Sequence, residues 1–166
     1  MPGVICEGIE SGTPGLARTS DQRHKDSRQG ILDFSQPFMP FESRALGELQ
    51  VTALPLLHSK PTLGYLLEGG GRRIAYLTDT VGLPHDTQAF LQREAVDVLV
   101  LDCSMPPQPQ TPRNHNDVNV ALQIIAAVKP DQAVLTHVGH TLDAWLMEHS
   151  AELPDHIRVA RDAMEV

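Results

Sequence analysis

The sequence predicts an α/β fold, a mixed sheet flanked by helices, and three observations support this prediction. Apolar runs of strand length alternate along the chain with segments of helix length. The run VDVLVLDC (96–103) is almost continuously apolar, which is typical of a strand covered on both faces. Five apolar residues between 116 and 128 recur at helical spacing and define one helix face: Val118, Ala121, Leu122, Ile125 and Val128. The 166 residues suffice for one domain with a real core.

The expected elements follow one another in the order strand, hairpin, helix, strand, helix, strand, helix and strand. No internal repeat interrupts this order, so one sheet with helices packed on it is the simplest arrangement. The elements are strand 49–57, hairpin strands 63–68 and 73–78, helix 83–95, strand 96–103, helix 116–128, strand 132–137, helix 141–149 and a closing strand over 157–166.

Local signals mark the ends of several of these elements. Pro55 in the first strand favours an edge position or a bulge, because proline donates no backbone hydrogen bond. Gly69–Gly71 supply the positive φ angles of the hairpin turn. Pro84 lies near the first turn of its helix, and Thr141 is the expected N-cap of the last helix. That last helix is expected to turn Leu142, Trp145 and Leu146 inward.

The chain divides near residue 30. Residues 1–30 are polar, with scattered glycines and no sustained period of 2 or 3.6, so we expect a loop or a disordered lead-in there. The segment ILDFSQPFMPF (31–41) carries three of the four phenylalanines and is expected to be an ordered loop or an edge strand. Residues 31–166 are therefore expected to form the folded domain.

Composition excludes several classes of protein. The chain has 13 Lys and Arg against 21 Asp and Glu, a formal charge of −8, and no basic cluster, so we expect no nucleic-acid partner. No apolar stretch is long enough to span a membrane, and no secretory signal is evident. Two cysteines do not make a disulfide framework, and the expected location is cytoplasmic. A small anionic substrate remains open, because a metal ion can supply the missing positive charge.

Four apolar strands each end in a residue of metal-binding type. The strand-end residues are His58, Asp79, Asp102 with Cys103, and His137. In open α/β sheets, sites form outside the carboxyl ends of the strands, so neighbouring strand ends would bring imidazoles and carboxylates together. Such a set suits Zn²⁺, Mn²⁺ or iron.

Each of these residues also has a structural alternative. A single histidine after a strand is commonly a capping or solvated residue, and Asp79 in LTDT suits an Asx-turn. Cys103 is expected to be a small buried hydrophobe. His115 in PRNHND precedes a predicted helix, where it could help to meet an anion.

From Ile31 onward the chain resembles the phosphoribosyl cyclic phosphodiesterases of phosphonate catabolism, the PhnP family, a branch of the metallo-β-lactamase superfamily. The matching stretches are ILDFSQPF, LPLLHSKPTLGYLLE, YLTDTVGLP, DCSMPP, PRNHND and LTHVGHTLDAWLMEH. The resemblance implies an αββα sandwich of mixed sheets flanked by helices, of which this chain is the C-terminal portion. It also implies hydrolysis of 5-phosphoribosyl 1,2-cyclic phosphate, a small cyclic phosphodiester, to ribose 1,5-bisphosphate.

The same resemblance implies roles for five residues. His58 would bind one of two catalytic divalent metal ions, Mn²⁺ or a similar ion. Asp79 would bridge both ions, and His137 would bind the second. His115 would be a catalytic residue that is not a ligand and that meets the phosphate or protonates the leaving oxygen. His140 would belong to a separate structural Zn²⁺ site.

The chain departs from the family pattern in two places. The main ligand motif of the superfamily, His-x-His-x-Asp-His, is absent. The family's N-terminal cysteine cluster is absent too, and Cys6 alone cannot replace it. We therefore expect both metal sites to be incomplete, with weak metal binding, poor solubility and no useful turnover. Residues 1–30 would be a frameshifted lead-in to a truncated reading frame, which sequencing of the upstream DNA would test.

Two other functions remain open at this point. One is a β-lactamase-fold nuclease that acts on RNA, against which the acidic charge counts. The other is a non-catalytic, degenerate fragment that packs against a partner. Without the first layer of the sandwich, one face of a hydrophobic sheet would be exposed, so a homodimer is a further expectation.

Overall fold

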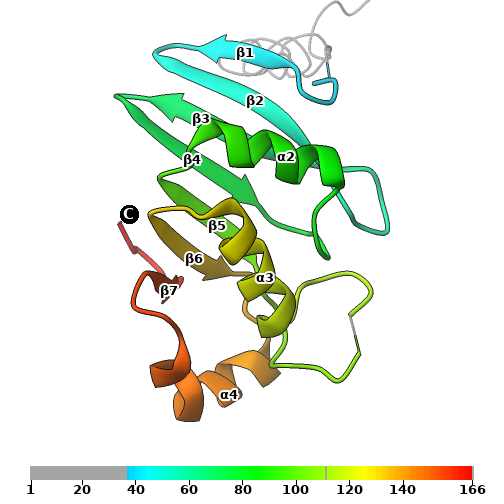
Figure 1. Cartoon of the computed structure of the whole chain (residues 1–166), viewed down its shortest axis with the longest axis vertical. Helices are drawn as coiled ribbons and strands as arrows, with labels where there is room; N and C mark the ends of the chain where they lie inside the picture. Colours follow the sequence, from blue (N-terminus) through cyan, green and yellow to red (C-terminus); the bar gives the residue numbers. More distant parts are fainter. Residues whose placement is uncertain (1–36, 111, 166) are drawn as a thin grey trace, which may run out of the picture. The chain divides into compact units, whose positions relative to one another are not determined.

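The computed structural model describes residues 37–110 and 112–165, and Phe38–Val166 form a compact unit. The expected lead-in over 1–30 lies outside the described residues. One seven-stranded sheet in sequential order runs through this unit (Figure 1). Its strands are β1 (Ser43–Leu46), β2 (Leu49–Leu56), β3 (Thr62–Gly69), β4 (Arg72–Leu77), β5 (Val98–Asp102), β6 (Gln132–Thr136) and β7 (Ile157–Val159).

The sheet is mixed, as predicted. Strands β1 to β4 form an antiparallel meander, and β5, β6 and β7 each run parallel to the preceding strand. Helices make the three parallel crossovers: α2 (His85–Glu94), α3 (Val118–Val128), and α4 (His140–His149) with the short 3₁₀-helix η1 (Ser150–Glu152). The carboxyl ends of β4, β5 and β6 therefore lie at the same end of the sheet.

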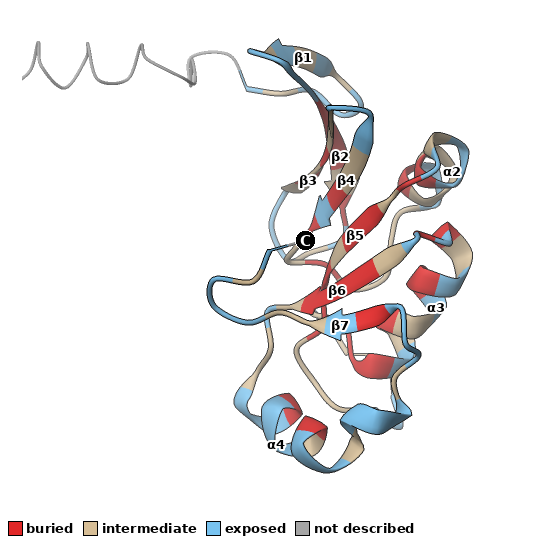
Figure 2. Ribbon diagram, turned by 90° about the vertical axis from the view of Figure 1, so that its left-hand side faces the viewer, coloured by how far each residue is buried: buried red, intermediate tan, exposed pale blue. Residues whose placement is uncertain are grey.

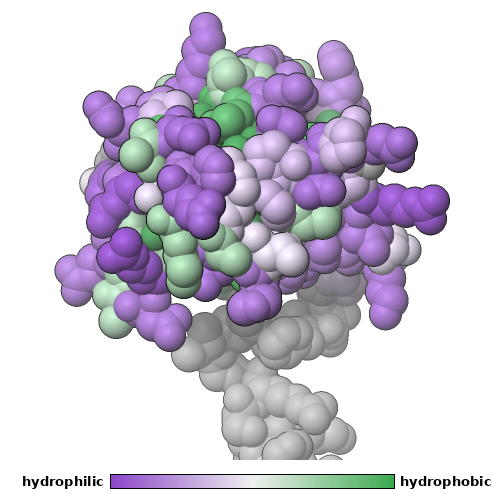
Figure 3. Space-filling view, turned by 90° about the horizontal axis from the view of Figure 1, so that it is seen from below, coloured by the Kyte–Doolittle hydropathy of each residue, from purple (hydrophilic) through white to green (hydrophobic). Residues whose placement is uncertain are grey.

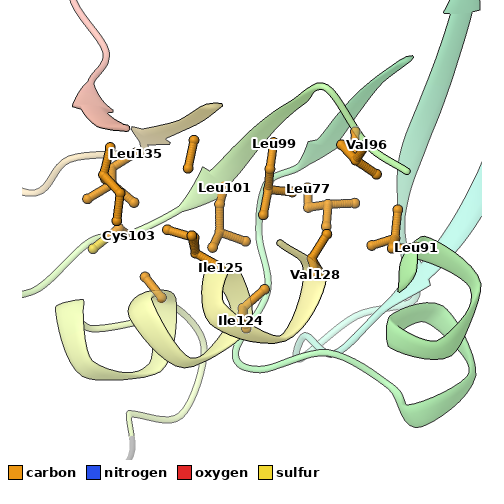
Figure 4. Packing of buried hydrophobic residues seen from close by; sticks show 14 of the residues in the cluster. Leu77, Leu91, Val96, Leu99, Leu101, Cys103, Ile124, Ile125, Val128 and Leu135 are labelled. Atoms are coloured by element: carbon orange, nitrogen blue, oxygen red, sulfur yellow. The ribbon is translucent and has the colours of Figure 1, made fainter. Parts of the chain in front are cut away.

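Helices α2 and α3 pack on one side of the sheet (Figure 2). Strand residues that alternate onto this side, including Leu77, Leu99, Leu101 and Leu135, are fully buried. They meet the apolar face of α3 (Figure 4). This face is rotated slightly from the predicted one: Ile124 is buried, whereas Leu122 is only partly buried.

The other side of the sheet carries an apolar row that spans five strands, β2 to β6, and continues into a charged residue of β7. The strand register aligns Ala53, Tyr65, Tyr76, Val100, Val134 and Arg158 across it. Tyr76 in the middle of the row is 45% exposed. Neither α2 nor α3 covers this side (Figure 2).

Several predicted boundaries were wrong for local reasons. Helix α4 begins at His140 with Gly139 as N-cap, so Thr141 lies inside the helix. A Cβ at residue 139 would lie 2.5 Å from the Ser104 carbonyl oxygen, which explains the glycine. The last strand ends at Val159. In the hairpin turn only Gly70 and Gly71 have positive φ.

Two other local predictions, the inward residues of α4 and the position of Pro55, agree more closely with the structure. Leu142 and Leu146 of α4 are buried, whereas Trp145 is half-buried and stacks on His149 at 4.4 Å. Pro55 lies in β2 beyond the residues that pair with β1, so its missing N–H interrupts no pairing on that side. Within the described part of the chain, no helix is both long and apolar enough to cross a membrane.

Replacing Gly64 with alanine is expected to destabilise the domain by about 1–3 kcal/mol. A Cβ there would lie 2.7 Å from Leu77 Cδ2 and 2.8 Å from the Tyr76 carbonyl oxygen, and the backbone oxygen cannot move aside cheaply. Urea denaturation followed by circular dichroism measures the change. Gly47→Ala is not a suitable control because its φ is positive, so Ser59→Ala, in the exposed loop after β2, serves instead. An unchanged midpoint in Gly64→Ala would contradict this packing.

Candidate metal centre

Five chain segments bring polar side chains to the carboxyl end of the parallel strands. Asp79 follows β4, Asp102 ends β5, and His137 follows β6. His58 follows β2, and His115 lies in the loop before α3. Because β4, β5 and β6 are parallel neighbours, their ends place Asp79, Asp102 and His137 side by side.

Asp79, His115 and His137 form a compact cluster of potential ligands. Each offers one ligand atom, and these atoms all lie within 4.8 Å of one another. His137 Nδ1 is 3.8 Å from Asp79 Oδ1, and the His115 and His137 rings stack at 4.5 Å. The His58 ring lies 5.3 Å from the His115 ring, so it borders the cluster. Four of the five predicted site residues therefore meet at one place.

The fifth predicted residue, His140, is the exposed first residue of α4. Among residues 37–110 and 112–165, it belongs to no cluster of three or more potential ligands. Its role in a structural Zn²⁺ site therefore stays a prediction.

The backbone is strained at two of the predicted ligands. Asp79 has φ of 59° and His137 has φ of 61°, values that residues with side chains rarely adopt. Such strain persists only where surrounding contacts hold it, and it concentrates at functional sites. One of these contacts is visible at His137, whose carbonyl oxygen accepts a hydrogen bond from Ser104 Oγ at 2.8 Å.

Asp102 is a fully buried carboxylate that orients His115. Its Oδ2 lies 2.7 Å from His115 Nδ1 and accepts a hydrogen bond from the Thr80 backbone N–H at 3.0 Å. Its Oδ1 is buried without a hydrogen-bond partner in the described part of the chain. A carboxylate at this distance favours the proton on Nδ1, which leaves His115 Nε2 available to the site.

His58 is oriented in the same way. Its Nδ1 lies 3.0 Å from the Asn114 carbonyl oxygen. A carbonyl oxygen only accepts, so Nδ1 carries the proton and Nε2 is left free to bind a metal.

Cys103 takes no part in the centre. It is fully buried in the hydrophobic core, and burial, together with the nearby Asp102 and Asp117 carboxylates, raises its thiol pKa to about 12. A metal ligand must be a thiolate, so the prediction of a small buried hydrophobe is confirmed.

The donor set fits a divalent transition metal. Imidazole nitrogens and a carboxylate oxygen are ligands of Zn²⁺, Mn²⁺ and iron, and three such side chains are usual for a catalytic zinc. Two of the potential ligands are accessible, because the side chains of Asp79 and His137 are 47% and 43% exposed. Seen from the end of the molecule that carries α4, the surface is mostly hydrophilic with small apolar patches (Figure 3).

Comparison with known proteins identifies the family. The sequence profile of the β-lactamase superfamily domain matches residues 14–138. The chain therefore belongs to the metallo-β-lactamase superfamily. The matched range begins at residue 14, inside the segment 1–30. We expect that segment to lack resemblance to the narrower phosphodiesterase family, which is a different comparison. The expected domain boundary near residue 30 therefore stays a prediction. No curated protein sequence matches the chain significantly.

Solved structures share the fold. A diphosphatase from the PhnP family is 22% identical, with a TM-score of 0.63, and the match covers 78% of this chain and 47% of that one. YhfI, a metallo-β-lactamase fold protein from Bacillus subtilis, is 17% identical, with a TM-score of 0.62 and coverage of 84% and 59%. The short form of human tRNase Z is 21% identical, with a TM-score of 0.55 and coverage of 70% and 41%.

These similarities confirm the predicted fold class, an α/β portion of the metallo-β-lactamase fold. The chain spans about half the length of these three structures. The superfamily consists mostly of hydrolases, and its fold generally binds divalent metal ions. The number and identity of the ions, and the substrate, belong to the proposal below.

Proposed function

We propose that this chain carries the C-terminal part of a metal-dependent phosphodiesterase that opens 5-phosphoribosyl 1,2-cyclic phosphate to ribose 1,5-bisphosphate. The observation that supports it is the cluster of Asp79, His115 and His137 at the ends of three neighbouring segments of the fold. The substrate class comes from the resemblance of the sequence to the phosphoribosyl cyclic phosphodiesterases, and a diphosphatase from the PhnP family shares the fold. The acidic charge favours a small substrate over a long polyanion.

In this proposal His58, Asp79 and His137 would hold two divalent ions, Mn²⁺ or a similar metal, and Asp79 would serve both. When bound, the ions supply Lewis-acid polarisation of the phosphate and lower the pKa of bound water. Opening the ring adds the oxygen of water to phosphorus and breaks one phosphorus–oxygen bond, and the released ribose oxygen must gain a proton.

His115 is the proposed donor of that proton. Its Nδ1 is engaged by buried Asp102, so Nε2 is the nitrogen left free to act as the donor. Asp102 fixes the orientation of the His115 ring, as the carboxylate does in a catalytic triad. Histidine suits the task because its side chain ordinarily titrates near neutral pH.

A nuclease that acts on RNA is the second candidate, because tRNase Z shares the fold at a TM-score of 0.55. Binding of RNA would show a steep dependence on salt concentration, since phosphate contacts release counterions. A filter-binding titration at two salt concentrations distinguishes the candidates, and we expect no salt-dependent RNA binding.

The site as it stands in this chain is short of ligands. Catalytic zinc ions usually take three protein ligands each. His58, Asp79 and His137 would give two ions only about two ligands each, even with Asp79 shared. We therefore propose weak metal binding and an impaired enzyme.

We expect slow hydrolysis of bis(p-nitrophenyl) phosphate that requires added Mn²⁺ and disappears in His137→Asn. Asparagine tolerates the positive φ at this position, so the fold is retained while the ligand is weakened. Release of p-nitrophenol is measured by absorbance, with the exposed His85→Asn as the matched control. Robust turnover would refute the impairment, and a rate that the His137 substitution leaves unchanged would refute the metal site.

The remaining expectations concern location and assembly. We propose a cytoplasmic location, a structural Zn²⁺ site that includes His140, and a homodimer. The apolar row with half-exposed Tyr76 supports self-association through the sheet. Multi-angle light scattering of the purified chain measures the oligomeric state, and a monomer would count against the homodimer.

A further inference from the structure

One buried residue connects the three loops that surround the candidate metal centre. Asn116 is fully buried, directly after His115 in the chain. Its Oδ1 accepts a hydrogen bond from the Gly82 N–H at 2.7 Å, in the loop that follows Asp79. Its Nδ2 donates to the Asp102 carbonyl oxygen at 2.9 Å, at the end of β5.

The backbone of Asn116 adds a third link. Its carbonyl oxygen accepts a hydrogen bond from the Ser104 N–H at 2.8 Å. Ser104 in turn donates its side-chain hydroxyl to the His137 carbonyl oxygen. Asn116 therefore bonds directly to two loops and reaches the third through Ser104.

We propose that Asn116 is a positioning residue of the centre. Its amide holds the loop of Asp79 and the loop of His115 against the end of β5, which sets how far apart these two side chains lie. The consequence for metal binding rests on the proposed function, whereas the consequence for the His115–Asp102 hydrogen bond does not.

The geometry explains why an amide is needed here. The partners on its two sides differ in kind, a backbone N–H at Gly82 and a backbone carbonyl at Asp102. Only a side chain with both an acceptor and a donor satisfies both at once, and asparagine is the shortest that does so with two separate atoms. Loss of either bond leaves the Gly82 N–H or the Asp102 carbonyl oxygen without this partner, which is unfavourable at a site closed to solvent on the Asp102 side.

Two substitutions test this role. Asn116→Ala removes both side-chain hydrogen bonds. Asn116→Gln keeps both a donor and an acceptor but places them one methylene farther from the backbone, so it moves the two loops without burying a charge and remains informative if the alanine variant does not fold. Thr52→Val is the matched control, because it also removes a buried side-chain hydrogen bond, to Ser43, away from the centre.

The first readout needs no metal. The Nδ1 proton of His115, held by Asp102, should give a slowly exchanging signal in ¹H–¹⁵N NMR spectra of the full chain. We expect this signal in the unsubstituted chain and in Thr52→Val, and its loss in both Asn116 variants.

The second readout is the affinity for Co²⁺, followed by visible absorption. We expect both Asn116 variants to bind Co²⁺ about 10–100-fold more weakly, as is usual when a group behind the ligands is removed. An unchanged His115 signal and unchanged Co²⁺ affinity in the Asn116 variants would overturn the proposal. If the unsubstituted chain bound no Co²⁺ but the His115 signal still depended on Asn116, the positioning role would stand and the proposed metal function would fail.

Discussion

Asp79→Asn is expected to weaken divalent metal binding by about 100-fold or more, beyond the roughly 10–100-fold loss typical of groups behind the ligands. Asp79 supplies the only carboxylate oxygen of the three-residue cluster in the described part of the chain. Asparagine has nearly the same shape and tolerates the φ of 59° at this position. The substitution therefore removes the negative charge and leaves the backbone conformation intact.

Isothermal titration with Zn²⁺ and with Mn²⁺ measures this effect. Asp86→Asn is the control, because Asp86 lies on α2 with its side chain 84% exposed and is not part of the cluster. Equal affinities for Asp79→Asn and the unsubstituted chain would mean that Asp79 is a turn residue, the structural alternative raised by its sequence context.

His115→Ala is expected to abolish opening of the cyclic substrate while metal affinity changes little. General acid catalysis contributes a factor of about 10²–10⁴, so its loss takes an already slow reaction to background. Hydrolysis of bis(p-nitrophenyl) phosphate should suffer much less, since p-nitrophenolate is a good leaving group that needs no proton. This contrast between two substrates separates proton donation from a general disturbance of the site.

His115 could be a proton donor or a metal ligand, and titration of the His115→Ala variant with Zn²⁺ decides between these two roles. His115 lies within the ligand cluster, so it could also bind a metal directly. If His115→Ala lowered Zn²⁺ affinity as much as Asp79→Asn does, His115 would be a ligand and its assigned role as a proton donor would be wrong. Asp102→Asn keeps the shape of the side chain behind His115. It should slow the opening of the cyclic substrate while the affinity for metal changes little.

The strand ends that carry Asp79 and His137 were predictable because apolar runs fix where a strand stops. The register of β4, β5 and β6 then brings these ends together, as the general rule for parallel sheets requires. Strand β1 was missed because four residues, SRAL, give neither a long apolar run nor a clear alternation. Its position follows from pairing with β2, which is a tertiary interaction.

The residues that hold the candidate ligands and their loops in place were harder to predict than the ligands themselves. Asp102 was recognised only as a polar strand end, and Asn116 was not singled out. Their roles depend on hydrogen bonds between residues 13 to 34 positions apart, which no local pattern encodes. The one available signal was a charged residue at the end of the buried run VLVLD, because a buried carboxylate needs partners.

The proposed metal centre is built from His58, Asp79 and His137. Equilibrium dialysis of the purified chain against Zn²⁺ or Mn²⁺, followed by elemental analysis, tests it most directly. We expect saturable binding by the unsubstituted chain and none by the triple variant His58→Ala, Asp79→Asn, His137→Asn. Metal content that is the same in the two proteins, whether both bind or neither does, would contradict it.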